Sequence, residues 1–237
     1  MCGRYVSPTL AEMERYWALS DEQTRDPFSQ HFNIAPTSQI PIIFLGVEGL
    51  RLQMARWGLV PFWWKQPKMP PFTFNARIEE AAGKPMWRQP VKSSRCLVPA
   101  IGWYEWKEVE VTDAVTGEIK KAKQPYFIHL PERQIFPFAG LMSWRTIGEN
   151  EEKVYSAAII TRAAEGPAAD VHTRMPLILS KDAEAAWIDP KQVDGQAALD
   201  IAQAGALTAV VHYPVSSRVN NSKSAGADLI EPFDNPA

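Results

Sequence analysis

The second residue of the chain, Cys2, carries the most distinctive chemistry in the sequence. Met1 is usually removed when a small residue follows it, and its removal would leave a free α-amine and a thiol on one residue. Such a 1,2-aminothiol can attack an aldehyde twice, first through nitrogen to give a Schiff base and then through sulfur to close a thiazolidine ring. The reference pKa values, about 7.7–8.0 for the amine and about 8.5 for the thiol, leave both groups partly deprotonated near neutrality. The start of the chain therefore predicts a nucleophile for aldehydes.

Glu105 is a candidate proton-transfer group. It stands in the segment GWYEWKE, and in a strand its side chain would share a face with Trp103 and Lys107. A carboxyl group among aromatic rings loses hydration, which raises its pKa toward the range useful for proton transfer. The other interpretation is an ordinary glutamate on an exposed strand face, and these residues alone leave both open.

His172 and Asn75 are further candidates. His172 lies in DVHTRMPLIL, just before an apolar run, where it could act as an acid–base group or make a structural hydrogen bond. Asn75 lies in FNARIE, where its amide could orient an amine or cap a turn. The four histidines show no spacing typical of a zinc site, so we expect neither a metal nor another cofactor.

Three arginines each follow one of these groups by two residues: Arg4, Arg77 and Arg174. Guanidinium groups bind phosphates in a bidentate manner, and ordinary surface arginines are the alternative. Nine tryptophans are a high number, and rings beside arginines can stack unpaired bases, although burial in a core is the alternative for each of them.

The composition is that of an ordinary globular protein. The chain has 237 residues, with 46% hydrophobic and 22% charged residues, which suits one substantial core. A net charge of −2 does not support coating of DNA through bulk charge but leaves a local basic cleft open. No apolar run approaches the ~20 residues of a membrane helix, and the first residues lack the apolar core of a signal peptide. With two cysteines, we expect a cytoplasmic, reduced protein in which Cys96 is buried and inert.

The hydrophobic pattern predicts an α+β fold. We expect a helix over 8–19, with Ser7 as its cap and Pro8 in its first turn, and helices over 181–188, capped by Ser180, and 194–204. The proline-rich segment 58–74 should be a loop, and 75–86 should begin as a turn and become a short helix. Strands are expected over 40–45, 52–57, 96–100, 103–111, 126–130, 135–144, 154–161 and 208–213, with a loop from 216 onward.

Because strands and helices do not alternate, we expect a single compact domain over residues 2–230 and a short tail over 231–237. Its core should be a curved, mixed or antiparallel, barrel-like sheet with peripheral helices. The hairpin tip at 112–123 and the last five residues should be the most mobile parts.

Taken together, the motifs resemble one known family. The chain contains, in order, MCGRY, FNIAPT, RWGLVPFWWK, FNARIEE, GWYEWKE, QPYFI, IITRAA, VHTRMPLIL and VSSRVNNSK. This series resembles the SRAP family (SOS-response-associated peptidase, or abasic-site processing protein) from Cys2 to about residue 230. The resemblance implies recognition of abasic sites in single-stranded DNA and a covalent DNA–protein crosslink through the N-terminal cysteine.

The resemblance also implies site residues. It makes Cys2 the nucleophile and Asn75, Glu105 and His172 its catalytic partners. The positions that match DNA contacts of the family are Arg4, Asn33, Trp63, Trp64, Arg77, Trp106, Thr161 and Arg174. We expect a monomer, associated with the nucleoid when bound to DNA, in which Cys2 could also serve self-processing of Met1.

Two other functions stay open. Glutamine amidotransferases of one class also begin Met-Cys-Gly, so an N-terminal-nucleophile amidohydrolase is one alternative, although Arg4 stands where those enzymes usually carry an apolar residue. The other is a module that binds single-stranded nucleic acid without covalent chemistry, in which Cys2 is incidental.

Overall fold

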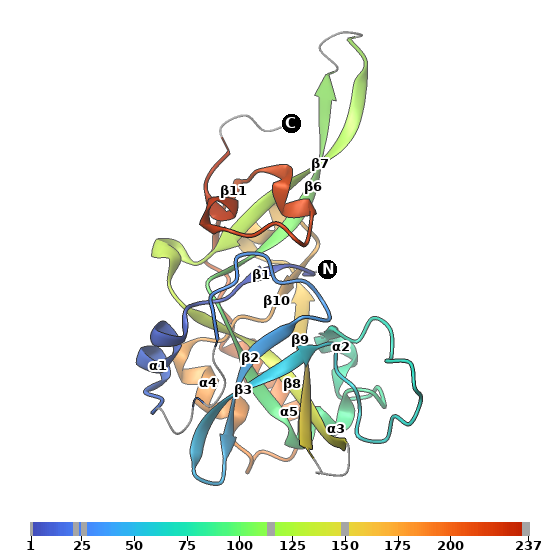
Figure 1. Ribbon diagram of the computed structural model, residues 1–237, viewed down its shortest axis with the longest axis vertical. Coiled ribbons are helices and arrows are strands. Elements are labelled where there is room, and N and C mark those ends of the chain that lie inside the picture. The colour runs from blue at the N-terminus through green and yellow to red at the C-terminus, as the bar shows by residue number, and fades with distance from the viewer. Residues whose placement is uncertain (1, 21–23, 25–27, 113–116, 148–151, 234–237) are drawn as a thin grey trace.

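The fold is built around a closed barrel. The computed structural model describes residues 2–20, 24, 28–112, 117–147 and 152–233. Among these, five strands pair in the ring β9-β3-β2-β5-β8-β9, in which β3 and β9 are parallel and the other pairs are antiparallel. The strands are β2 (Gln39–Gly46), β3 (Gly49–Trp57), β5 (Arg95–Ala100), β8 (Phe136–Ile147) and β9 (Glu152–Ala163). Figure 1 shows this mixed barrel in the lower half of the molecule.

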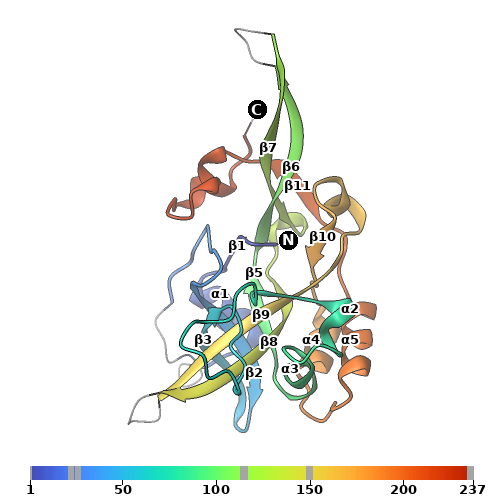
Figure 2. The same ribbon diagram turned by 90° about the vertical axis from the view of Figure 1, so that its right-hand side faces the viewer.

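Alternation along the barrel strands divides the buried residues into two clusters. On β9, Ala157 and Ile159 join one cluster, whereas Ala158 and Ile160 join the other. Successive side chains of a strand point to opposite faces, so one cluster fills the barrel and the other lies between the barrel and the helices. The second cluster includes residues of α1 (Leu10–Trp17), α4 (Lys181–Ile188) and α5 (Gly195–Ala204). Helices α4 and α5 lie together on one side of the barrel (Figure 2).

A second, antiparallel sheet stands beside the barrel. It has the order β1-β6-β7-β11 and consists of β1 (Tyr5–Val6), β6 (Gly102–Thr112), β7 (Ile119–His129) and β11 (Val211–Pro214). Strands β6 and β7 continue past the body of the molecule as a two-stranded arm (Figures 1 and 2). Because β1 pairs with β6, with Tyr5 opposite Trp103, the residues before β1 run alongside β6 at the edge of this sheet.

Two short strands extend the barrel sheet along β9. The strands β4 (Asn75–Arg77) and β10 (Arg174–Pro176) both pair with β9, β4 in parallel and β10 in antiparallel orientation. The remaining helices are α2 (Ile78–Ala81) and α3 (Arg88–Ser93), and the 3-10 turns are η2 (Pro131–Arg133), η3 (Gly166–Asp170), η4 (Ser217–Asn220) and η5 (Ala227–Ile230). The two short strands therefore carry Asn75 and the segment after His172 to the same edge of the barrel.

The predicted α+β fold with a barrel-like mixed sheet is confirmed, and so are most of its elements. The helix near the N-terminus is not capped by Ser7, because Thr9 and Glu12 form a reciprocal capping box and Ser7 instead accepts a hydrogen bond from the backbone N–H of His31. Asn75 lies in a strand rather than a turn because β9 supplies a hydrogen-bonding edge for it. The strand expected at 208–213 begins at Val211, and the strand expected at 126–130 begins at Ile119.

Some sequence predictions concern details outside these elements. Residues 113–116 of the hairpin tip and the last four residues of the tail lie outside the described part of the chain. The helices of the described residues are too short and too polar to cross a membrane. Five of the nine tryptophans are buried, and Cys96 is buried as expected, with its pKa raised by that burial.

Candidate active site

Cys2 lies at the centre of the candidate site. Its side chain is fully buried and packs with the cluster inside the barrel, and its Sγ lies 3.9 Å from the carbonyl oxygen of Arg4. Burial raises the pKa of the Cys2 thiol well above its ordinary value, and the charge of Glu105 raises it further. At neutral pH the thiol is therefore protonated, and its reaction needs a nearby group that accepts the proton.

Asn75 holds the backbone of Cys2. Its Nδ2 donates a hydrogen bond of 2.6 Å to the carbonyl oxygen of Cys2. Its Oδ1 is buried and has no hydrogen-bond partner among the described residues. Buried amide oxygens are nearly always hydrogen-bonded, so this oxygen is available to a donor that joins the site. The turn-capping alternative for Asn75 is wrong, because β4 directs its amide to Cys2.

Glu105 is buried, and the alternative of a surface glutamate is wrong. The residue is 2% exposed and lies near the start of β6. Burial raises the pKa of Glu105 to about 7. A carboxyl group with this pKa can both donate and accept a proton near neutrality, which is the property of a general acid–base catalyst.

His172 faces Glu105 with one defined nitrogen. The backbone N–H of Arg174 donates to His172 Nδ1 at 3.0 Å, and His172 Nε2 lies 4.0 Å from Glu105 Oε2. The acceptor role of Nδ1 places the proton of the neutral ring on Nε2, which faces the carboxylate. Burial lowers the pKa of His172, so the ring is neutral at pH 7. The structural hydrogen bond and the candidate chemistry thus use different nitrogens of the same ring.

The four candidate catalytic residues come from four separate segments, and two of them, Glu105 and His172, line one cavity, while Cys2 and Asn75 are buried. The cavity has a volume of about 450 Å³ and is lined by Glu105, Trp106, Lys123, His172 and Asn220. Sequence reasoning does not single out Lys123 or Asn220. Lys123 lies on β7, whose pairing with β6 is long-range in the sequence, so only the structure shows that it lines the cavity.

Arg4 and Asn33 bind the C-terminal segment of the chain. The guanidinium of Arg4 donates to Asn33 Oδ1 at 2.8 Å and to the carbonyl oxygen of Val219 at 2.7 Å. The amide of Asn33 donates to the carbonyl oxygens of Asn221 and Ser224 at 3.0 and 3.1 Å. In this structure their polar atoms secure η4 and the residues after it against the N-terminal segment, close to Cys2.

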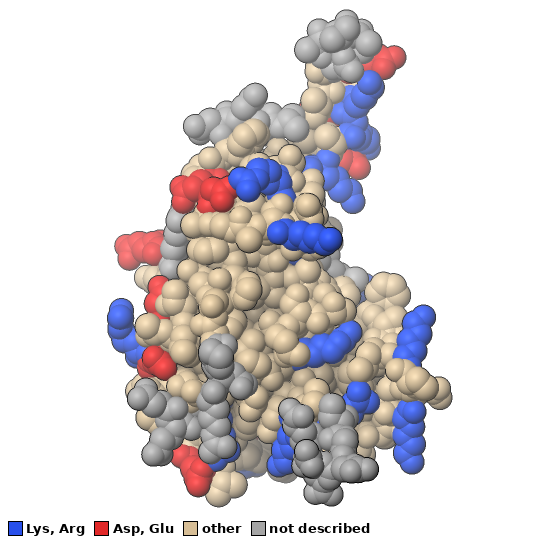
Figure 3. Space-filling model, in the orientation of Figure 1, with Lys and Arg blue, Asp and Glu red and all other residues tan. Residues whose placement is uncertain are grey.

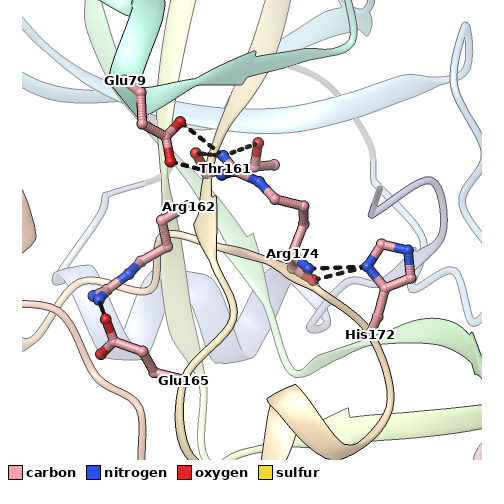
Figure 4. Close-up of polar contacts among 6 residues, drawn as sticks. All are labelled: Glu79, Thr161, Arg162, Glu165, His172 and Arg174. Carbon is pink, nitrogen blue, oxygen red and sulfur yellow. Dashed lines mark hydrogen bonds and ion pairs between the residues drawn. The ribbon is translucent and has the colours of Figure 1, made fainter.

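Arg174 contacts both Thr161 and His172. Figure 4 shows the Arg174 side chain between Glu79 and Thr161, and the main chain of Arg174 beside His172. Arg174 Nη2 donates to the carbonyl oxygen of Thr161 at 2.7 Å, and in the antiparallel pairing of β10 with β9 Arg174 lies opposite Ala163. Arg162, next to Thr161, forms a separate ion pair with Glu165 (Figure 4).

The remaining predicted DNA contacts differ in exposure. Arg77 is exposed at the end of β4. Trp106 is half-buried at the cavity, and its Nε1 donates to Asn220 Oδ1 at 2.7 Å. Trp63 is 44% exposed, and Trp64, whose ring centre lies 6.0 Å from that of Trp63, lines a different cavity of about 630 Å³. The structure therefore brings Trp106 to the candidate site and leaves the two other rings on the 58–74 loop.

The charge of the surface is mixed. Lysines and arginines are scattered over the face shown in Figure 3, and several lie on the β6–β7 arm next to acidic residues. At the cavity itself, Lys123 is the lysine that lines the wall. Among the described residues, no group of three or more His, Cys, Asp or Glu side chains is arranged to hold a metal ion.

Comparison with known proteins identifies the family. The model of the family described as SOS response associated peptidase (SRAP) matches residues 1–222. The chain belongs to the SRAP family. The abasic site processing protein YoqW of Bacillus subtilis is 33% identical over 233 residues, covering 98% of this chain and 99% of that protein. The abasic site processing protein YedK of Escherichia coli is 32% identical and covers 98% of this chain and 100% of that protein.

Solved structures agree on the fold of this SRAP protein. A phage-related protein from Bordetella bronchiseptica superposes with a TM-score of 0.68 at 32% identity, covering 91% of this chain and 95% of that one. A protein from Bacteroides thetaiotaomicron gives a TM-score of 0.67 at 22% identity, covering 93% and 90% of the two chains. The second similarity shows the fold alone.

Proposed function

We propose that this protein captures abasic sites in single-stranded DNA through a covalent thiazolidine link to Cys2, formed after removal of Met1. Relatives that match it over nearly their whole length are named abasic site processing proteins. The observation that carries the proposal is that Glu105, a carboxyl group with a pKa of about 7, and the neutral His172 line one cavity, and that the charge of Glu105 also acts on the buried thiol of Cys2. The crosslink would shield the lesion until it is reversed or degraded.

In the first steps of the proposed reaction, the α-amine of Cys2 forms a Schiff base with the opened sugar. An abasic deoxyribose must open to expose its aldehyde, and the Glu105 carboxyl can transfer the proton for ring opening. The α-amine of Cys2 then adds to the aldehyde carbon, and loss of one water from the carbinolamine gives the Schiff base. Asn75 Oδ1, which lacks a partner among the described residues, would accept the N–H of this amine while Nδ2 holds the Cys2 carbonyl. His172 Nε2–H would donate to a sugar oxygen.

Ring closure belongs to the thiol. The Cys2 sulfur adds to the carbon of the Schiff base, and the C=N double bond becomes a single bond. The thiol proton ends on nitrogen, so no further water or reductant is needed. Because burial keeps the thiol protonated, Glu105 is the group suited to accept this proton and pass it to nitrogen.

The DNA would be held through its backbone. Arg4, Arg77 and Arg174 would supply guanidinium groups for phosphates, and Trp106, which lines the cavity, would supply a ring for a neighbouring base. Asn33 and Thr161 would act through the segments they secure, and Trp63 and Trp64 would contact the strand farther from the lesion. Contacts of this kind do not depend on a base, which suits a lesion that has none. We further propose that residues 2–230 act as one domain and that the protein binds as a monomer, and the cytoplasmic localisation stays a prediction.

The family name also includes peptidase activity. The proposed chemistry requires removal of Met1, because the α-amine of Cys2 must be free, and self-processing through Cys2 is the form of peptidase activity that would supply it. A glutaminase assay separates this protein from the amidohydrolase alternative, and family membership favours capture of abasic sites.

Intact mass measurement tests the proposal. The protein alone is expected to have the mass of the chain without Met1. After incubation with a single-stranded oligonucleotide that contains one abasic site, a second species should appear at the summed masses minus one water. A protein that keeps an N-terminal extension before Cys2 is the matched control and should form no such species. Equal adducts with and without the extension would contradict the role of the α-amine.

The salt dependence of binding tests the arginines. Each phosphate neutralised on a single strand contributes about −0.7 to the slope of log affinity against log salt, so three contacts give a slope of about −2. Arg77→Ala should make this slope less steep by about 0.7, as measured by fluorescence anisotropy with an undamaged strand. Arg88→Ala, at an exposed position on α3, should leave it unchanged. A flat response for the unmodified protein would remove the arginines from the DNA site.

A further inference from the structure

The guanidinium of Arg174 is occupied by an acidic side chain of the same protein. Its Nη1 donates to Glu79 Oε1 at 2.6 Å, and its Nη2 donates to Glu79 Oε2 at 3.1 Å (Figure 4). A planar carboxylate on a guanidinium fork has the geometry that a phosphate also uses. Glu79 therefore fills the position at which Arg174 would bind a phosphate.

The other donors of Arg174 offer no second place for a phosphate. Nη2 also donates to the carbonyl oxygen of Thr161, and Nε is buried without a partner among the described residues. The side chain of Arg174 is only 16% exposed, whereas that of Glu79 is 51% exposed. A DNA strand that approaches from solvent thus contacts Glu79 before it reaches Arg174.

The position of Glu79 allows its carboxylate to separate from the guanidinium of Arg174. It projects from α2, a helix of only four residues, and half of its side chain is in solvent. Water and salt compete for the exposed carboxylate, which weakens an ion pair that is partly in solvent. Hydrogen bonds from Arg174 lower the pKa of Glu79, so the carboxylate is charged and repels a phosphate at neutral pH.

We propose that Glu79 occupies the phosphate-binding edge of Arg174 in the free protein and that a backbone phosphate of single-stranded DNA displaces it. This inference rests on the proposed function, since it needs DNA as the ligand of the site. Glu79 then acts as a specificity-determining residue. It lowers the affinity for any DNA strand that makes no further contacts with the protein. A DNA strand with an abasic site offsets this loss of affinity through its covalent link to Cys2.

Two matched variants on α2 test whether a DNA phosphate displaces Glu79 from Arg174; we call this displacement the exchange. The probe is a fluorescent single-stranded oligonucleotide without abasic sites, bound to the full chain at low salt. Glu79→Gln is expected to bind it about threefold to fivefold more tightly, the size of a partly exposed ion pair. Glu80→Gln is the control, because Glu80 carries the same charge on α2 but pairs with Lys84 at 2.5 Å instead of Arg174.

A variant that lacks Arg174 distinguishes displacement of Glu79 from Arg174 by a phosphate from simple charge repulsion between Glu79 and the DNA. In an Arg174→Gln protein, Glu79→Gln should no longer tighten binding, because no guanidinium is left to be released. The inference is overturned if Glu79→Gln does not tighten binding, if Glu80→Gln tightens it equally, or if the gain persists without Arg174. Absence of measurable binding by both the unmodified protein and Glu79→Gln overturns it as well.

The two proposals can fail separately. If Glu79→Gln tightens binding but no adduct of the expected mass forms on abasic DNA, the exchange stands and the covalent function fails. If the adduct forms normally but Glu79→Gln leaves affinity unchanged, only the exchange fails.

Discussion

The Cys2→Ser variant is expected to lose the stable adduct with abasic DNA completely. Removal of Met1 still leaves an α-amine on the substituted residue, so the Schiff base can form. It hydrolyses again, because a hydroxyl is a much weaker nucleophile than a thiol and does not close a stable ring. The measurement is a denaturing gel after heating, with and without prior treatment with borohydride, which reduces a Schiff base to a stable amine.

The two halves of this experiment give different results if the proposal is right. The serine variant should show an adduct only after reduction, whereas the unmodified protein should show it in both samples. Cys96→Ser is the matched control, because Cys96 is also buried but lies within β5, and it should retain the adduct. A heat-stable adduct of Cys2→Ser without borohydride would show that the thiazolidine assignment is wrong.

Glu105→Gln is expected to slow crosslinking by about a hundredfold or more, the usual contribution of a positioned proton donor and acceptor. The amide keeps the shape of the side chain but neither accepts the thiol proton nor donates one to the sugar. Affinity for an undamaged strand should change far less than the rate. The measurement compares single-turnover crosslinking rates with equilibrium binding, and an equal loss of both would make Glu105 a structural residue.

The same variant is expected to gain stability at alkaline pH. Burial raises the pKa of Glu105 from 4.5 to about 7, so the folded protein holds this proton more tightly than the unfolded chain does. The resulting stabilisation is present below about pH 4.5 and is lost as the pH rises through about 7. At pH 8 the free energy of unfolding of Glu105→Gln should therefore exceed that of the unmodified protein by about 3 kcal/mol, and the difference should vanish in acid.

Urea unfolding at several pH values measures this gain. Glu108→Gln is the matched control on the same strand, because Glu108 is exposed and pairs with Lys121. It should lower stability slightly or leave it unchanged at every pH. A Glu105→Gln protein that is less stable than the unmodified protein at pH 8 would contradict a costly buried carboxylate.

Several elements could be predicted from sequence because their causes are local. The hairpin of β2 and β3 follows from two apolar runs around a turn with glycine at each end, and α4 follows from Ser180 at its N-cap. The 58–74 loop follows from its four prolines. The predictions were wrong where a segment distant in the sequence determines the secondary structure. Asn75, for example, lies in a strand only because β9 runs beside it.

The candidate site also combines features that the sequence predicts with features that depend on the tertiary structure. The aminothiol at Cys2 and the order of the motifs depend only on the sequence, and they pointed to the SRAP family, which the family match confirmed. The roles of the individual residues stay predictions. The burial of Glu105 could not be predicted from the sequence, because a strand has two faces and only tertiary packing decides which of them is excluded from solvent.

What the sequence determined by itself is the reactive chemistry and the kind of element around each residue, because both depend on side-chain type and on neighbours along the chain. Only the tertiary structure decided which groups meet, which proton each one holds and which are already occupied. Proton affinities depend on burial and on charges that arrive from other strands, as at Glu105 and His172. The pairing of Arg174 with Glu79 joins residues 95 positions apart, and no local pattern in the sequence specifies it.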